Sequence, residues 1–347
     1  MTTSGHDMSR AALLPTPGDP FLLTLWSYFF KNVWGKEIDK LYICINNIFL
    51  PESTEYIKSL FKDCSNVEIE FIDLISHPNV VGDHGKIIAH MLNQVEEDYI
   101  LLIEDDGFIF KPGYVNDYFL KLENYEYDLI GSRRGSCSDV IIEQSKIKYN
   151  IVEQNGHDNG PNFWPCFFFI RKNIFELTDK NFSAKLWDKN SILPIFEKTL
   201  DTDCAGDTMV WMSMQLRNLN LKIGDCPQFH GNLSDVLDYE LGLNNFNGTS
   251  YWLHAGSLSS GIGGFLSDKD LINYCNTDEE KMEIERRICF WSLGLDSYFK
   301  ESSSQNKIDK IAFQYQSWLQ RLVKHYQLSD SRIDYSKKMY AELLEWT

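Results

Sequence analysis

A run of five apolar residues that ends directly in three acids constrains the fold of this chain more than any other feature. The run is YILLI, residues 99–103, and the acids are Glu104, Asp105 and Asp106. A strand that is apolar on both faces is typical of the centre of a parallel sheet, which helices cover on both sides. Such sheets bind their ligands at the carboxyl ends of the strands. The sequence therefore predicts a buried central strand with three carboxylates at the ligand-binding edge.

The segments around this strand alternate between strand and helix patterns. Apolar runs typical of strands and apolar residues at helical spacing follow one another at residues 11–16, 21–33, 41–45, 51–64, 67–75 and 85–95. Asp19 lies just before Pro20 at the start of the first predicted helix, where a carboxylate caps the helical N–H groups. This alternation predicts an α/β fold with a doubly wound, mostly parallel sheet flanked by helices.

The second half of the chain divides into a mixed region and a helical region. The patterns predict strands at 127–131, 167–170 and from 221 to about 230, a helix at 207–219, and loops at 132–161 and 242–264. Beyond Asp268, apolar residues recur at helical spacing in two stripes, Ile284, Ile288, Trp291 and Leu295, and then Ile308, Ile311, Tyr315, Leu319 and Leu322. We therefore expect an α/β domain at residues 1–266 and a small helical subdomain at residues 267–347.

The balance of charge argues against nucleic acid as a partner. The chain has 33 Lys and Arg residues against 50 Asp and Glu residues, a formal charge of −17, and its densest basic spots are pairs such as Arg133-Arg134. An acidic surface repels phosphate polymers and anionic membranes.

The eight cysteines include no Cys-x-x-Cys pair. Because the sequence also shows no signal peptide and no apolar run of about 20 residues, we expect a reduced, cytoplasmic protein without a transmembrane segment.

The acidic triplet is a candidate metal site. Three adjacent carboxylates repel one another unless a cation is present. A divalent ion such as Mn²⁺ or Mg²⁺, held by one or two carboxylates and by substrate phosphates, removes this conflict. A solvated acidic turn is the simpler alternative. The buried strand before the acids and the segment FIFKPG after them, residues 108–113, favour the metal site.

The segment LLIEDDGFIFKPGYVNDYF, residues 101–119, resembles the signature of the GT-A glycosyltransferases. In that signature an apolar strand precedes an acidic DXD motif, an apolar position and a Pro-led helix, and the Glu-Asp-Asp version is similar to the triplet of inverting N-acetylglucosaminyltransferases. The resemblance implies a Rossmann-like GT-A fold, a nucleotide-sugar donor with a UDP-sugar favoured, and a hydroxyl acceptor on a glycan, lipid or protein. It also implies that Asp106 binds the metal directly, whereas Glu104 and Asp105 contact the ribose or hydrogen-bond locally.

Two earlier segments extend this resemblance, which spans residues 11 to about 264. LLPTPGDPFLLTLWSYF, residues 13–29, is similar to the opening strand and helix of the GT-A fold, and GDHGKIIAHMLNQVEEDYILL, residues 82–102, to the segment before the triplet. Thr16, Asp73 and Lys86 are therefore candidate donor contacts, and the resemblance places Lys86 near a phosphate. A solvated lysine at a helix start is the simpler alternative for Lys86.

Inverting transfer needs a base that takes the proton of the acceptor hydroxyl, and a carboxylate usually serves. LDTDCAGDTMVWMSMQLRNLNLKIG, residues 200–224, resembles the part of GT-A enzymes in which an acid opens a helix. Asp207 is thus the candidate catalytic base and the expected N-cap of that helix. Asp201 and Asp203 are its rivals for the catalytic role.

Two histidines are candidates to complete the metal site, as a late histidine does in GT-A enzymes. We prefer His254 in WLHAGSLSSGIGG to His230 in QFHGN, because the Gly- and Ser-rich stretch after His254 suits a lid that offers backbone N–H groups to phosphate. Ordinary packing is the alternative for each histidine. Trp164 is a candidate for stacking on a sugar ring, and a buried core position is its alternative.

Other functions fit the sequence less well. A sugar nucleotidyltransferase would carry a Gly-rich N-terminal loop with Arg and Lys, which residues 13–21 lack. A metal-dependent phosphohydrolase would need a second Asp or His cluster near the first, and a hydroxymethylated DNA base as acceptor conflicts with the net charge of −17. A non-catalytic nucleotide-sugar-binding module of the same fold stays open, and a donor hydrolysis assay separates it from an enzyme.

Overall fold

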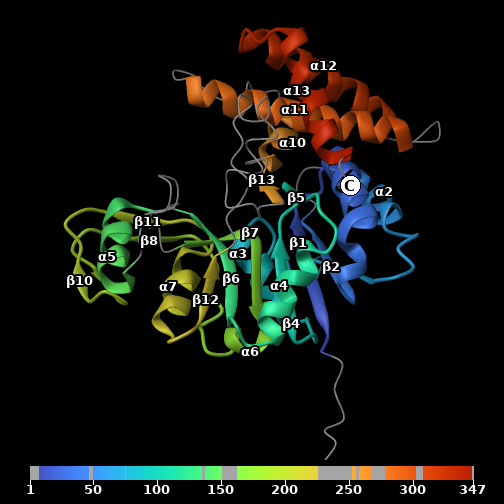
Figure 1. Cartoon of the computed structure of the whole chain (residues 1–347). Coiled ribbons are helices and arrows are strands. Elements are labelled where there is room, and N and C mark those ends of the chain that lie inside the picture. The colour runs from blue at the N-terminus through green and yellow to red at the C-terminus, as the bar shows by residue number, and fades with distance from the viewer. Residues whose placement is uncertain are drawn as a thin grey trace, which may run out of the picture.

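A seven-stranded sheet forms the centre of the molecule (Figure 1). The computed structural model describes residues 8–46, 50–74, 76–134, 137–150, 162–225, 252–254, 258–267, 278–301 and 308–345. The strands lie in the order β12 (Ile223–Asp225), β6 (Leu129–Arg134), β7 (Asn162–Arg171), β4 (Tyr99–Ile103), β1 (Arg10–Thr16), β2 (Lys40–Ile45) and β3 (Glu68–Ile72). Only β7 runs antiparallel to its neighbours in this sheet. The prediction of a mostly parallel α/β sheet with the YILLI strand near its centre is confirmed.

Helices cover both faces of the sheet, because successive residues of each strand point to opposite sides. On one face, Leu101 and Ile103 share a core with α1 (Pro20–Phe29), α2 (Thr54–Leu60) and α4 (Tyr114–Glu123). On the other face, Ile100 and Leu102 pack in a core with α3 (His84–Leu92), α6 (Lys172–Phe175) and α7 (Val210–Asn218). This double cover explains why the strand is apolar throughout.

A small lobe flanks the β12 side of the sheet (Figure 1). It contains α5 (Asp139–Tyr149) and the short strands β8 (Lys185–Trp187), β9 (Ile192–Leu193), β10 (Lys198–Thr199) and β11 (Cys204–Gly206). Ile141 of α5 packs there in a separate core with Leu193 and Leu200. The predicted loop at 132–161 is therefore wrong for α5. The apolar stripe of this helix was too short to recognise, since it serves only this small core.

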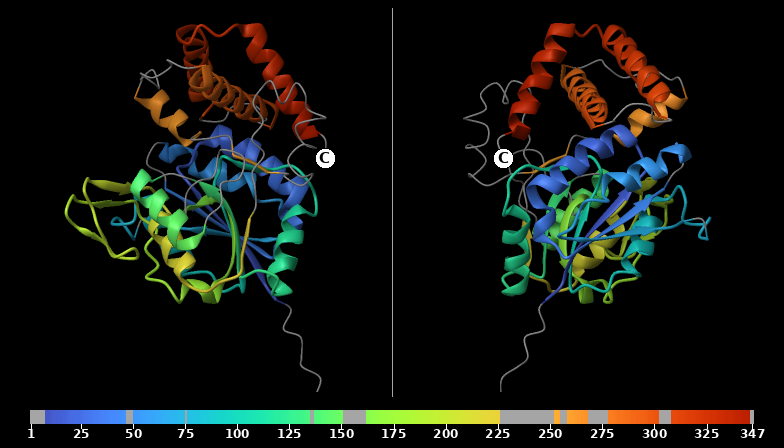
Figure 2. Two further views of the ribbon diagram at one scale, coloured as in Figure 1. Left: turned by 60° about the vertical axis from the view of Figure 1, so that its left-hand side comes forward. Right: turned by 90° about the vertical axis from the view of Figure 1, so that its right-hand side faces the viewer.

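Four helices form the C-terminal part of the described chain: α10 (Ser259–Leu266), α11 (Asp278–Glu301), α12 (Asp309–His325) and α13 (Asp330–Glu345). They lie over the carboxyl edge of the sheet, as the views in Figures 1 and 2 agree. The helical prediction beyond Asp268 is confirmed, and both predicted apolar stripes are buried or half-buried. The predicted loop at 242–264 is wrong for residues 252–254, which form the strand β13, and for residues 259–264, which belong to α10. Among the described helices, none has the length and apolar character to cross a membrane.

The C-terminal helices share the core that covers α1. Phe21 of α1 contacts the rings of Tyr298 and Tyr315 with centroid separations of 5.3 and 4.9 Å, and Phe108 stacks on Phe290 at 5.1 Å. The division at residue 266 stays a prediction, but these contacts join the two regions into one hydrophobic interior.

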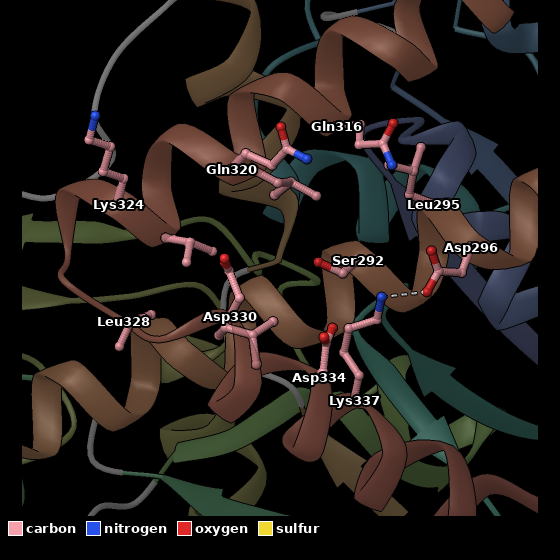
Figure 3. Close-up of a pocket in the computed structure, with 13 residues that line it drawn as sticks. Ser292, Leu295, Asp296, Gln316, Gln320, Lys324, Leu328, Asp330, Asp334 and Lys337 are labelled. Atoms are coloured by element: carbon pink, nitrogen blue, oxygen red, sulfur yellow. Dashed lines mark ion pairs between the residues drawn. The ribbon is translucent and has the colours of Figure 1, made fainter.

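The helices α11, α12 and α13 line a cavity of about 780 Å³, where an ion pair joins α13 to α11 (Figure 3), and a second ion pair joins the same two helices outside the cavity lining. Lys337 Nζ lies 2.6 Å from Asp296 Oδ2, and Arg332 Nε lies 2.7 Å from Glu285 Oε2. Glu285 is buried, so its charge needs these partners, and the Ser336 hydroxyl also donates to it.

Gly294 allows the close approach of α11 to α1. A Cβ atom at this position would lie 2.8 Å from the Phe21 carbonyl oxygen. In an ordinary helix interior Gly→Ala stabilises by about 1 kcal/mol. Here we expect Gly294→Ala to lower the free energy of unfolding by about 1–3 kcal/mol, because the added methyl group overpacks a backbone contact. Urea denaturation measures the change, and a stabilised variant would show that α11 has room to shift.

Asp19 caps α1 as predicted, but in a fully buried position. Its Oδ1 accepts hydrogen bonds from the Phe21 and Leu22 N–H groups at 2.9 and 3.2 Å. Its Oδ2 is buried without a hydrogen-bond partner among the described residues. Burial raises the pKa of Asp19 from 3.8 to about 6.

This pKa predicts a loss of stability as the pH rises. The folded chain binds the proton of Asp19 more tightly than the unfolded chain, so its contribution falls between about pH 4 and 6, by up to about 3 kcal/mol. Asp19→Asn keeps an oxygen for the helical N–H groups and stays neutral. We expect its stability relative to the wild type to rise over this pH window, as urea denaturation at pH 4 to 8 would measure. A difference that is independent of pH would contradict the assignment.

Candidate active site at the carboxyl edge

The acidic triplet follows directly on β4 and lies at the carboxyl edge, as predicted. Asp105 and Asp106 are only 3 and 4% exposed. Asp105 Oδ2 accepts a hydrogen bond of 2.6 Å from the Thr16 hydroxyl, which itself accepts from the Gly18 N–H. Burial, and then the nearby Asp106, raise the pKa of Asp105 well above its ordinary value. Thr16, predicted as a donor contact, is thus the residue that holds Asp105.

Asp106 is held by segments far from it in the sequence. Its Oδ2 accepts a hydrogen bond of 3.2 Å from the Leu258 N–H at the start of α10. The Cys166 thiol lies 3.9 Å from its Oδ1, because β7 runs antiparallel to β4 and brings Cys166 to the carboxyl edge. Gly107 leaves space for this sulfur, since a Cβ there would lie 2.7 Å from Cys166 Sγ.

The donor atoms of Glu104, Asp106 and Cys166 lie within 4.8 Å of one another. Carboxylate oxygens are the ligands that Mn²⁺ and Mg²⁺ prefer. Burial and the charge of Asp106 raise the pKa of the Cys166 thiol well above its ordinary value, and sulfur is a soft ligand that such hard ions do not prefer. The residues therefore fit a hard divalent ion held by Glu104 and Asp106.

His84 belongs to this site, although the sequence analysis did not single it out. It is the first residue of α3, and its Nε2 lies 3.2 Å from Glu104 Oε1. Burial lowers the pKa of His84, whereas the negative charges of Asp106, Asp207 and Asp83 act to raise it. The charges of both Asp106 and Asp207 therefore act on His84. A signal for it was its position in the first turn of a helix at the carboxyl edge.

Lys86 lies on another side of α3. It is exposed, its Nζ lies 3.4 Å from Asp83 Oδ2, and it lines a cavity of about 340 Å³ with Lys180 and Lys185. The structure thus brings Lys86 to that cavity instead of to the triplet. Gly85 between His84 and Lys86 packs against the chain at Ser183, where a Cβ atom would lie 2.3 Å from the backbone nitrogen.

Asp73 lies just beyond the end of β3, at the same edge of the sheet as the triplet. It is exposed, and its charge contributes to the raised pKa of Cys44 at the end of β2. Because β1 and β2 lie between β3 and β4, two strands separate Asp73 from the triplet along the carboxyl edge.

Asp207 is an exposed residue in the loop between β11 and α7. The prediction that it caps this helix is wrong, because α7 begins at Val210 and its N-cap is Met209 in a left-handed conformation. The carboxylate accepts a hydrogen bond of 2.7 Å from the Thr208 N–H instead. Asp203, one of its rivals, accepts from the Lys189 N–H at 2.7 Å.

The other predicted site residues are described only in part. His254 lies in β13 (Trp252–His254), which pairs with β5 (Gly107–Ile109) so that His254 stands opposite Gly107, the residue after the triplet. The side chain of His254 lies outside the described part of the structure, as does that of Trp164 in β7. His230 lies outside the described residues altogether. The stretch after His254 forms α10 from Ser259 onward, and its role as a lid stays a prediction.

No protein-family model matches the chain, and no curated protein matches it in sequence. The solved structures to which it is similar include glycosyltransferases. S. aureus TarS 1-349 in complex with UDP-GlcNAc is 11% identical, with 97% of this chain and 89% of that chain covered and a TM-score of 0.40. The mannosyltransferase PcManGT from Pyrobaculum calidifontis, in complex with GDP-Man and Mn²⁺, is 8% identical, with 99% and 88% covered and a TM-score of 0.42. Mouse xyloside xylosyltransferase 1 is 10% identical, with 73% and 98% covered and a TM-score of 0.42.

Proposed function

We propose that this chain is a metal-dependent glycosyltransferase that moves a sugar from a nucleoside-diphosphate sugar to a hydroxyl acceptor. One observation carries the proposal. Glu104 and Asp106 converge at the carboxyl edge of the sheet, within 4.8 Å of each other's ligand atoms, and Asp106 is held in place by the Leu258 N–H. Such a pair of carboxylates suits a divalent ion that also contacts a diphosphate.

The residues of the triplet have two roles in this proposal. Asp106 and Glu104 are the metal ligands, and Mn²⁺ or Mg²⁺, when bound, neutralises negative charge on the departing diphosphate. Asp105 is hydrogen-bonded to Thr16, and its raised pKa suits a group that shapes the site rather than one that binds the ion. His84 orients Glu104 through the contact at 3.2 Å. His254 opposite Gly107 is a further candidate ligand.

Asp207 is the proposed base. This residue is exposed, its carboxylate accepts a hydrogen bond from the Thr208 N–H, and it lies near enough to His84 to affect the pKa of that histidine. In direct displacement, the acceptor oxygen bonds to the anomeric carbon while the bond from that carbon to the diphosphate oxygen breaks. Asp207 takes the hydroxyl proton, and the nucleoside diphosphate leaves. This route inverts the anomeric configuration.

A thermal-shift screen of UDP-, GDP-, CDP- and TDP-sugars, each with Mn²⁺ and with a chelator, tests the proposal. We expect one nucleotide class to stabilise the chain only with the metal, by about 2.7 kcal/mol at a donor concentration of 100 times Kd. Product analysis of that donor with hydroxyl acceptors then distinguishes transfer from binding alone. A donor that binds equally well in chelator would overturn the metal-bridged site.

A further inference from the structure

The metal ligand Asp106 is connected by a chain of hydrogen bonds to the C-terminal helices. Leu258 stands at the junction. Its N–H donates to Asp106 Oδ2 at 3.2 Å, and its carbonyl oxygen accepts from the Trp291 Nε1–H of α11 at 3.0 Å. The Gly261 N–H of α10 also donates to this carbonyl at 2.9 Å. The backbone N–H and C=O groups of Leu258 thus link Asp106 to the indole of Trp291.

All parts of this connection are buried. Leu258 and Trp291 are 0 and 1% exposed, and Asp106 is 4% exposed. Hydrogen bonds in such surroundings are not exchanged for bonds to water, so losing one leaves a buried group unsatisfied. The bond to Oδ2 also limits rotation of the Asp106 carboxyl group and so fixes the direction of both of its oxygens.

The sequence of α10 is adapted to the indole. A Cβ atom at Gly261 would lie 2.4 Å from Cε2 of Trp291. Glycine at this position therefore lets the indole ring lie against the first turn of α10, where its N–H reaches the Leu258 carbonyl.

We infer that Trp291 is a positioning residue for the metal site, acting through the Leu258 peptide on Asp106. The inference rests on the proposed function, because it assigns Asp106 to a divalent ion. Residues that orient metal ligands typically contribute 10- to 100-fold to metal affinity. Since Trp291 acts through the backbone of one intervening residue, we expect an effect at the lower end of this range, about 10-fold.

Trp318 provides a matched control. It is also a buried tryptophan, 1% exposed, and its ring packs against Trp291 with a centroid separation of 5.7 Å. Its Nε1–H has no hydrogen-bond partner among the described residues. Trp→Phe at either position removes similar volume from the same cluster, but only Trp291→Phe removes the bond to Leu258.

Two measurements on the full chain test the inference. Titration with Mn²⁺ alone, followed by electron paramagnetic resonance, should give a Kd about 10-fold weaker for Trp291→Phe and close to the wild-type value for Trp318→Phe. Hydrogen–deuterium exchange without metal should show faster exchange of the Leu258 N–H in Trp291→Phe than in Trp318→Phe. The second measurement does not depend on any bound ion.

The outcomes separate the two proposals. A wild-type chain that binds no Mn²⁺ contradicts the proposed function, whatever the variants do. A wild-type chain that binds Mn²⁺, with equal affinities and equal Leu258 exchange in both variants, refutes the role of Trp291 while leaving the proposed function intact. If Trp291→Phe does not fold, Gly261→Ala displaces the indole from the Leu258 carbonyl, and unchanged Mn²⁺ affinity in that variant counts equally against the inference.

Discussion

Asp106→Asn is expected to reduce metal-dependent sugar transfer by at least about 100-fold, because residues that merely orient a metal ligand already contribute 10- to 100-fold. Asparagine keeps the shape of the side chain and an oxygen that accepts from the Leu258 N–H. It lacks the negative charge that holds a divalent ion. The kcat/KM for transfer and the Kd for Mn²⁺ measure the two parts of this effect.

The neighbouring residue provides the control for this substitution. Asp105 is as deeply buried as Asp106, but it is bound to Thr16 and its pKa is raised. Asp105→Asn should therefore change Mn²⁺ affinity much less than Asp106→Asn. Equal losses from both variants would mean that general disruption of the triplet, and not the loss of a metal ligand, explains the result. Unchanged transfer in Asp106→Asn would remove the basis of the proposed function.

Asp207→Asn is expected to lower kcat by about 10²- to 10⁴-fold, the usual contribution of a general base. Donor and Mn²⁺ affinity should stay close to the wild-type values, because the Asp207 carboxylate accepts from the Thr208 N–H and does not belong to the group of Glu104, Asp106 and Cys166 whose ligand atoms lie together. Single-turnover transfer measures the chemical step, and calorimetric titration with the donor measures binding.

Asp203→Asn is the matched control for the base. Asp203 is also exposed, also accepts a hydrogen bond from a backbone N–H, and lies four positions earlier in the same stretch of chain. Transfer should be nearly unchanged in this variant. A large loss of kcat in Asp203→Asn, with normal turnover in Asp207→Asn, would assign the base to Asp203 instead.

The sheet was predictable because its signals are local and repeated. A strand such as β4, apolar on both faces, and the helices at 3.6-residue spacing around it each fill a window long enough to recognise. The side lobe was not predictable, since β9 and β10 have two residues each and α5 buries few apolar side chains. The helix α10 was predicted as a loop because of its glycines, and Gly261 among them lies against Trp291, which is thirty positions later in the sequence.

The acidic residues of the site could be predicted from the sequence, but the groups that hold them in place could not. Glu104, Asp105 and Asp106 follow a strand whose position the pattern indicates, and Thr16 is the last residue of the neighbouring strand β1. Cys166 and Leu258 are far from the triplet in the sequence and come close to it only when the chain folds. Leu258 makes its contact through its backbone N–H, and a backbone group has no signature in a sequence. In the segment GDHGK, Lys86 was predicted as a site residue and His84 was not, because a sequence does not show which way each side chain points. Residues two apart on a helix do not face the same way, so only one of them meets the triplet.

The close packing of α11 against α1 at Gly294 limits how relatives of this chain can differ in length. A shorter relative without α11 would leave Phe21 and Phe108 facing water, and its Leu258 carbonyl would lack the indole. Because Tyr315 of α12 also contacts Phe21 and Arg332 of α13 pairs with buried Glu285, we expect α11, α12 and α13 to be kept or lost together, with polar residues in place of Phe21 wherever they are missing.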